Sequence, residues 1–185
     1  MYRNYETKHI FMTIGFCIAL LCPFIIMLAP HIVAETLHSN QNLWIVQAPS
    51  VNYYLYAIGF LLLIASCLLL YFMDARKNAI LPSVICTLLS VIPFYIAAQS
   101  YKSLSEESIS FRNAYSLSDR NYTWDQVKSI THYVGNEGDS SEFTFLFQDG
   151  QSMELSENGY TDQILGQFYS LCRTYNLKIK QINKS

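Results

Sequence analysis

Three long runs without a charged side chain fill most of the first hundred residues, at about 10–30, 51–73 and 79–98. A helix that crosses the ~30 Å hydrocarbon core of a bilayer needs about 20 apolar residues, so each run is long enough. The apolar residues surround each expected helix instead of forming a stripe, which is typical of helices buried in lipid or in a bundle. The sequence therefore predicts a membrane protein whose transmembrane domain, residues 1–102, holds three α-helices.

Charged residues are sparse up to Ser100 and frequent after it. The first hundred residues carry seven of them, whereas the remaining 85 carry eight Lys or Arg and eleven Asp or Glu. This contrast predicts a separate water-soluble domain at residues 103–185. The formal net charge of −2 and the lack of a long basic run argue against a nucleic-acid partner.

The Lys and Arg residues near the expected helices predict their orientation. Arg3 and Lys8 precede the first run, Arg76 and Lys77 lie in the short turn between the second and third, and residues 31–50 contain none. Because basic loops stay on the cytoplasmic side, we expect a cytoplasmic N-terminus in a multi-pass protein of the cell membrane. Three crossings then place the C-terminal domain outside the cytoplasm.

The first run has an alternative interpretation as a cleaved signal peptide. Its apolar stretch is longer than usual, and no clean small-x-small site precedes polar sequence, so a retained helix is favoured. None of the three runs contains Asp, Glu, Lys or Arg. Transporters and ion pathways generally need such groups within the membrane, and the runs therefore indicate an anchor and a packing surface.

The C-terminal part shows the periodicity of strands followed by that of a helix. Phe143, Phe145 and Phe147 alternate with other residues, and Asp149-Gly150 then predicts a hairpin turn. After Gly159 an apolar stripe indicates one amphipathic helix. The stripe consists of Ile164, Leu165, Phe168, Leu171, Cys172 and Tyr175. We expect Thr161 to cap this helix, residues 177–180 to add a last strand, and the whole to be an α+β domain of antiparallel strands with a C-terminal helix.

The order of these patterns resembles a known family. The stretch YTWDQVKSI, the hairpin FTFLFQDGQSMELS and the C-terminal helix are similar to the bacterial pleckstrin-homology-like (PH-like) domains that are attached to small multi-span membrane proteins. The resemblance implies a curved seven-stranded sheet or half-barrel capped by the helix, acting as a non-enzymatic binding or assembly module. Relatives often hold this domain in the cytoplasm, in contrast to the orientation that the charges predict here. Phosphoinositide binding is not carried over, because no basic cluster lies near the first hairpin.

One group of residues has the spacing of metal ligands. If the segment after the first run is helical, His31, Glu35 and His38 align on one face at offsets of 0, 4 and 7, and such a set can bind zinc. The simpler interpretation is an amphipathic segment at the membrane surface whose polar side contains histidines. No cofactor is predicted.

Three residues are candidates for partner contact. Asn136 and Asp139 belong to a polar loop between expected strands, for which an ordinary mobile loop is the alternative, and Trp44 lies near the start of the second run. His132 lies in a predicted strand, where we expect it to face solvent, and no serine lies in a Gly-x-Ser-x-Gly turn. A catalytic role is therefore not expected.

Three functional hypotheses follow. The first is a non-enzymatic module, held at the bilayer by its helices, that binds a protein partner or envelope component as an accessory subunit or homo-oligomer. The second is a regulator or immunity-type protein that acts through its membrane helices. The third is a metal-dependent membrane enzyme that uses His31, Glu35 and His38.

Overall fold

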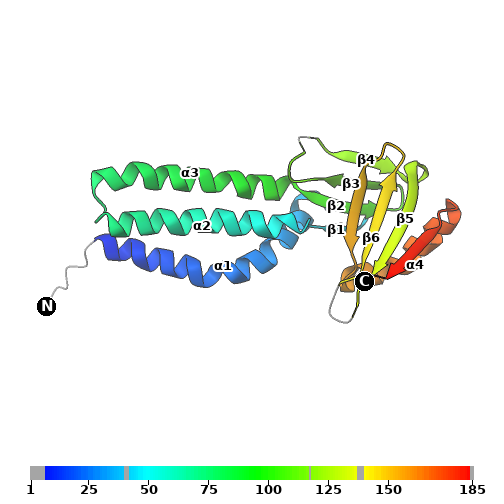
Figure 1. Ribbon diagram of the computed structural model, residues 1–185, viewed down its shortest axis with the longest axis horizontal. Coiled ribbons are helices and arrows are strands. Elements are labelled where there is room, and N and C mark those ends of the chain that lie inside the picture. Colours follow the sequence, from blue (N-terminus) through cyan, green and yellow to red (C-terminus); the bar gives the residue numbers. More distant parts are fainter. Residues whose placement is uncertain (1–6, 40–41, 117, 137–139, 184–185) are drawn as a thin grey trace. The chain divides into compact units, whose positions relative to one another are not determined.

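The computed structural model describes residues 7–39, 42–116, 118–136 and 140–183 (Figure 1). The chain divides into two compact units. Met1–Leu37 and Ala48–Ser100 form the first, called here the helical unit. His38–Gln47 and Tyr101–Ser185 form the second, called here the sheet unit.

The described part of the helical unit contains three helices that are long and apolar enough to cross a membrane: α1 (Thr7–His38), α2 (Val51–Phe72) and α3 (Lys77–Gln99). The predicted second and third helices are confirmed to within two residues. The first helix continues eight residues beyond the predicted end at residue 30. It contains Pro23 and Pro30, each of which removes a helix hydrogen bond, and its ribbon bends in Figure 1.

Small and polar residues bring α2 and α3 together. A Cβ atom on Gly59 would lie 2.6 Å from the Phe94 ring, so the ring can keep this position only when residue 59 is glycine. Further along, the Ser66 hydroxyl donates to the Ser83 carbonyl oxygen at 2.9 Å. The face that Gly59 and Ser66 share is thus a packing face, as close helix approach requires. At the far end of this pair, Asn52 donates to the Ala97 and Ser100 carbonyl oxygens at the end of α3.

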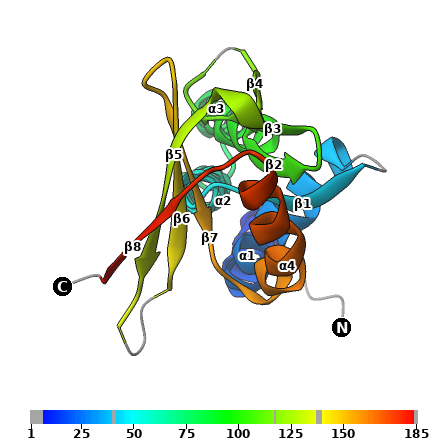
Figure 2. The same ribbon diagram turned by 90° about the vertical axis from the view of Figure 1, so that its right-hand side faces the viewer.

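The described part of the sheet unit contains eight strands in two four-stranded sheets. The first sheet has the order β1 (Leu43–Gln47), β2 (Tyr101–Ser105), β3 (Ser108–Arg112), β4 (Arg120–Thr123), and the second has the order β7 (Ser152–Ser156), β6 (Glu142–Phe147), β5 (Val127–Val134), β8 (Ile179–Asn183). A short 3-10 helix, η1 (Trp124–Gln126), carries the chain from one sheet to the other, and the strands of the two sheets cross in Figure 1. All pairings are antiparallel except that of β5 with β8, which follows α4 (Gly159–Thr174) and returns to the sheet edge (Figure 2).

Strand β1 comes from the segment between the first two helices, which the sequence presented only as a connecting loop. It pairs antiparallel with β2, which begins directly after α3. The register places Ile45 opposite Leu104, and Gln47 opposite Lys102. The sheet unit thus includes His38–Gln47 in addition to Tyr101–Ser185.

The core of the sheet unit is aromatic, as the alternating pattern predicted. Phe143, Phe145 and Phe147 are at most 1% exposed, and Phe111 and Trp124 are fully buried with them. The α4 stripe covers this core through its buried members Ile164, Phe168 and Cys172. Because Gly150 has a φ of +83°, which glycine adopts without strain, the Asp149-Gly150 turn is also confirmed.

Two local expectations about the C-terminal part were wrong in detail. Asn158, not Thr161, precedes the first residue of α4, and the two residues cap one another. The Thr161 amide donates to Asn158 Oδ1 at 3.2 Å, and the Asn158 amide donates to Thr161 Oγ1 at 2.6 Å. The last strand begins at Ile179, two residues later than the predicted start at residue 177. It is also parallel to β5.

Candidate functional site

An open pocket of about 410 Å³ lies where β1 begins and β2 ends. Its described lining comes from the sheet unit. The lining residues are Asn42, Leu43, Trp44, Ser105, Glu106 and Glu107. This volume is within the usual range of small-ligand sites, and the lining combines an indole, an aliphatic side chain and two carboxylates.

A β-bulge sets the position of Trp44 in this pocket. The register between β1 and β2 pairs Leu43 with Ser105 and Ile45 with Leu104, so Trp44 is the extra residue on β1. Bulges bend a strand and re-aim its side chains, and they occur often next to functional sites. Trp44 lines the pocket, whereas its neighbour Ile45 is buried in the core.

The opposite wall is the tight turn between β2 and β3. The Ser105 hydroxyl accepts a hydrogen bond from the Ser108 amide at 2.9 Å and donates one to the Ser108 carbonyl oxygen at 3.0 Å. Ser105 is buried, whereas Glu106 and Glu107 at the tip are exposed. The hydroxyl therefore holds a turn that presents two adjacent carboxylates to solvent.

Trp124 supports both walls from the core. Its indole N–H donates to the Ser105 carbonyl oxygen at 3.1 Å, and its ring lies 6.5 Å from the ring of Trp44. Trp124 belongs to η1, where the Thr123 amide donates to Gln126 Oε1 at 3.0 Å as part of a capping box. Trp44 lines the pocket and packs on Trp124, which is buried in the core, and this packing restricts the movement of the Trp44 side chain.

The described lining of the pocket is negative, because it contains Glu106 and Glu107 but no Lys or Arg. The nearest cation along β2 is Lys102, which lies opposite Gln47 at the other end of the strand. Burial lowers the pKa of the Lys102 ammonium, and Glu154 and Glu142 partly offset this effect.

The three predicted metal ligands all lie on α1. The helix does continue through His38, as the spacing argument required. However, the His38 ring stacks on Tyr101 with 4.0 Å between centroids. Across the described ranges, no three His, Cys, Asp or Glu side chains are grouped so that they could hold a metal ion. The structure therefore adds no geometric support to a site of His31, Glu35 and His38.

The predicted partner loop is only partly described. Asn136 is exposed just after β5, whereas Asp139 lies outside the described residues. Among the candidates for partner contact, Trp44 lines the pocket described above. The Leu-Trp-Ile-Val run that carries Trp44 has the composition of a strand, which is the one local signal that could have revealed β1.

His132 is less exposed than the sequence suggested. Its side chain is 14% exposed, its ring stacks on Phe143, and its Nε2 lies 3.0 Å from Glu157 Oε2. These contacts join β5 to the segment between β7 and α4. His132 thus packs against the edge of the core instead of facing open solvent.

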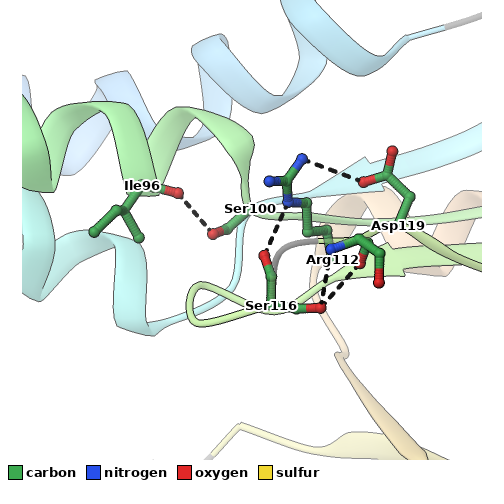
Figure 3. A network of polar contacts seen from close by, with 6 residues as sticks. Ile96, Ser100, Arg112, Ser116 and Asp119 are labelled. Atoms are coloured by element: carbon green, nitrogen blue, oxygen red, sulfur yellow. Dashed lines mark hydrogen bonds and ion pairs between the residues drawn. The ribbon is translucent and has the colours of Figure 1, made fainter.

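A second polar network organises the connection between β3 and β4. Arg112 Nε donates to the Ser116 carbonyl oxygen at 3.2 Å, and Arg112 Nη1 lies 3.7 Å from Asp119 Oδ1 (Figure 3). Figure 3 also shows the Ser100 hydroxyl donating to the Ile96 carbonyl oxygen at 2.8 Å, which closes the last turn of α3. The Arg112 contacts hold the β3–β4 connection, and the Ser100 contact holds the end of α3. None of these residues belongs to the described lining of the pocket.

Comparison with known proteins does not assign this arrangement. No protein-family model matches the chain, and a search of curated proteins found no similar sequence.

Proposed function

We propose that this protein is a membrane-anchored, non-enzymatic binding module, and that its sheet unit binds a partner through the pocket at Trp44. The observation that carries the proposal is β1. This strand lies between two apolar helices in the chain, completes the first sheet and supplies one wall of the pocket. Anchoring raises the effective concentration of a binding surface near the bilayer, so that modest contacts suffice.

Strand pairing supports three crossings. Because β1 pairs with β2, the α1–α2 connection and the chain after α3 must lie on the same side of a membrane. Three crossings satisfy this condition. At the opposite end of the helices, Lys8 and Asp74 form an ion pair of 2.9 Å, which agrees with a shared side for the N-terminus and the α2–α3 turn. With the basic residues of these two segments in the cytoplasm, the sheet unit is extracytoplasmic.

The arrangement of the sheet unit supports a PH-like domain. Two sheets joined at a corner and covered by one helix after the last hairpin agree with the resemblance in the sequence. The described strands number eight, whereas the resemblance implies seven. In addition, β1 precedes two of the helices in the chain and β8 follows α4. Such a domain is a scaffold on which sites differ, so the pocket and not the fold carries the functional argument.

The pocket lining supports binding more than catalysis. Its two carboxylates lie on an exposed turn, in water, whereas carboxylates that act in acid–base catalysis are commonly desolvated beside a reacting group. A partly buried indole beside exposed polar groups is typical of the centre of a protein interface.

Site-specific photo-crosslinking tests this function. A photoreactive phenylalanine analogue replaces Trp44 in the full chain in cells, and the control carries it at Tyr115, which is 82% exposed on the β3–β4 connection. We expect a discrete crosslinked partner at position 44 and none at position 115. The same products at both positions, or none at position 44, would contradict the proposal.

A second candidate function, regulation of a membrane partner through the helices, is favoured by α1. Its buried residues are Gly15, Pro30 and Ala34, although most of its surface is apolar. An apolar groove of about 260 Å³ runs between α1 and Phe60 of α2. A chain that ends at Gln99, with a Gly-Ser linker replacing residues 40–47, distinguishes the two functions. Co-purification of the partner with this chain would favour the helices, and its loss would favour the pocket.

A further inference from the structure

We propose that the Trp44 pocket binds the cationic side chain of a Lys or Arg in an extended segment of the partner protein. This inference rests on the proposed function and specifies the chemistry of the same site. It is carried by the combination of charge, an aromatic wall and pocket size.

The first argument is charge. The described lining holds Glu106 and Glu107 and no Lys or Arg, and Asp125 is next to Trp124 in the supporting η1. Carboxylates accept hydrogen bonds only, and ammonium and guanidinium groups donate only, so the two sets are complementary.

The second argument is the indole, which is independent of charge. Cations bind the faces of aromatic rings, and tryptophan is the strongest partner among the side chains. Trp44 is held beside the glutamate turn by a bulge in β1 and by the Trp124 ring behind it. A stretch of carboxylates that served only solubility would not require an aromatic side chain at a re-aimed position.

The third argument is size and lining. A volume of about 410 Å³ is much larger than a bare ion, and Leu43 and Trp44 offer apolar surface along one side. Lys and Arg bury their methylene stems on such surface while their charged ends reach polar groups.

The experiment uses full-length protein in nanodiscs of phosphatidylcholine, whose headgroups carry no net charge and therefore do not concentrate a basic peptide at the bilayer. The probe is a short blocked peptide of Arg and Gly, and the matched control peptide contains citrulline, which keeps the shape of Arg without its charge. We expect measurable binding of the Arg peptide, weakening with added salt, and no measurable binding of the citrulline peptide. Equal binding of both peptides would overturn the inference.

Variants locate the binding. E106Q with E107Q should weaken the Arg peptide about two- to thirtyfold, as for two surface charge pairs. W44L should weaken it about two- to fivefold. The control D162N removes an exposed carboxylate from the first turn of α4 and should leave binding unchanged. Because Trp44 also packs on the core, the glutamate variants, which lie on an exposed turn, decide the result if W44L fails to fold. Equal effects of D162N and of the E106Q and E107Q double variant would overturn the inference.

Other outcomes separate the inference from the function on which it rests. A crosslinked partner at position 44, together with equal binding of both peptides, would leave the proposed function standing and overturn the cation assignment. Binding of the Arg peptide without any crosslinked partner would overturn the proposed function and support the charge assignment. Displacement of the Arg peptide by tetramethylammonium at lower concentration than by free arginine would show a quaternary-ammonium site and overturn the assignment to Lys or Arg.

Discussion

The side-chain amide of Gln47 forms two hydrogen bonds with the backbone of Ser156, one from Nε2 to the carbonyl oxygen at 3.0 Å and one from the backbone N–H to Oε1 at 3.1 Å. The amide therefore takes the place of a neighbouring strand. Gln47 ends β1 at the edge of the first sheet, and Ser156 ends β7 at the edge of the second. This contact closes the sheet unit between two strands that are more than one hundred residues apart in the chain.

Replacement of Gln47 by alanine should destabilise the sheet unit. Both backbone groups of Ser156 lose a partner near the edge of the core, and Gln47 itself is 6% exposed, so we expect a loss of about 2–3 kcal/mol in the free energy of unfolding. Urea unfolding in detergent, followed by near-UV circular dichroism, measures it. Gln148→Ala is the matched control, since its amide donates to Asp125 at an exposed position, and it should cost less than about 1 kcal/mol. Equal losses would show that the link between β1 and β7 is unimportant.

Adding one methyl group at Gly59 should loosen the pair of α2 and α3. Its Cβ would lie 2.6 Å from the Phe94 ring, and overpacking of this kind costs about 1–3 kcal/mol. Gly166→Ala in α4 is the opposite control. It has nothing within 4 Å and should stabilise by about 0.5–1 kcal/mol. Melting temperatures from size-exclusion chromatography of heated samples measure both changes. Phe94→Ala should restore tolerance to alanine at position 59, and a G59A protein as stable as the natural chain would refute the close contact.

The Asp149 carboxylate should titrate at lower pH than an ordinary aspartate. The Tyr122 hydroxyl donates to it at 2.6 Å, and this bond together with that from the Gln151 amide lowers the pKa of Asp149. A lowered pKa in the folded state stabilises the fold above the unfolded pKa of about 3.9, and this contribution is lost as pH falls through the folded value. In Tyr122→Phe the Asp149 pKa should move up towards its ordinary value, as carboxyl NMR titration would show. An unchanged titration curve would mean that the hydroxyl is not the cause.

Cysteine labelling should place the sheet unit outside the cytoplasm. Asn136→Cys, in a chain whose four span cysteines are alanine, should react with a membrane-impermeant maleimide added to intact cells. Cys172 serves as an internal control, because it is 2% exposed and burial raises its pKa to about 11. Its thiol is therefore neutral and covered at about pH 8 and should react only after denaturation. Labelling at position 136 that requires cell lysis would reverse the proposed orientation.

Local patterns predicted the elements that form from neighbouring residues. The uncharged runs predicted α2 and α3, and the spacing of Phe143, Phe145 and Phe147 predicted a strand whose inner face is the core. The α1 helix exceeded its prediction because the polar residues after Pro30 do not end a helix by themselves, and a Pro inside a membrane helix is tolerated. The cap of α4 was misplaced by three residues, since Asn158 and Thr161 are both good capping residues and only their mutual hydrogen bonds identify the first position.

By itself, the sequence determined the three apolar helices, the hairpin and the covering helix, because each depends on a period of hydrophobic residues that is complete within one segment. Only the tertiary structure decided that residues 43–47 form a strand and that Trp44 stands beside Glu106 and Glu107. The physical reason is that β1 is stabilised by pairing with β2 and by burial of Ile45 in a distant core. A five-residue strand gains its hydrogen bonds and its buried surface from partners far along the chain, and no local pattern records them.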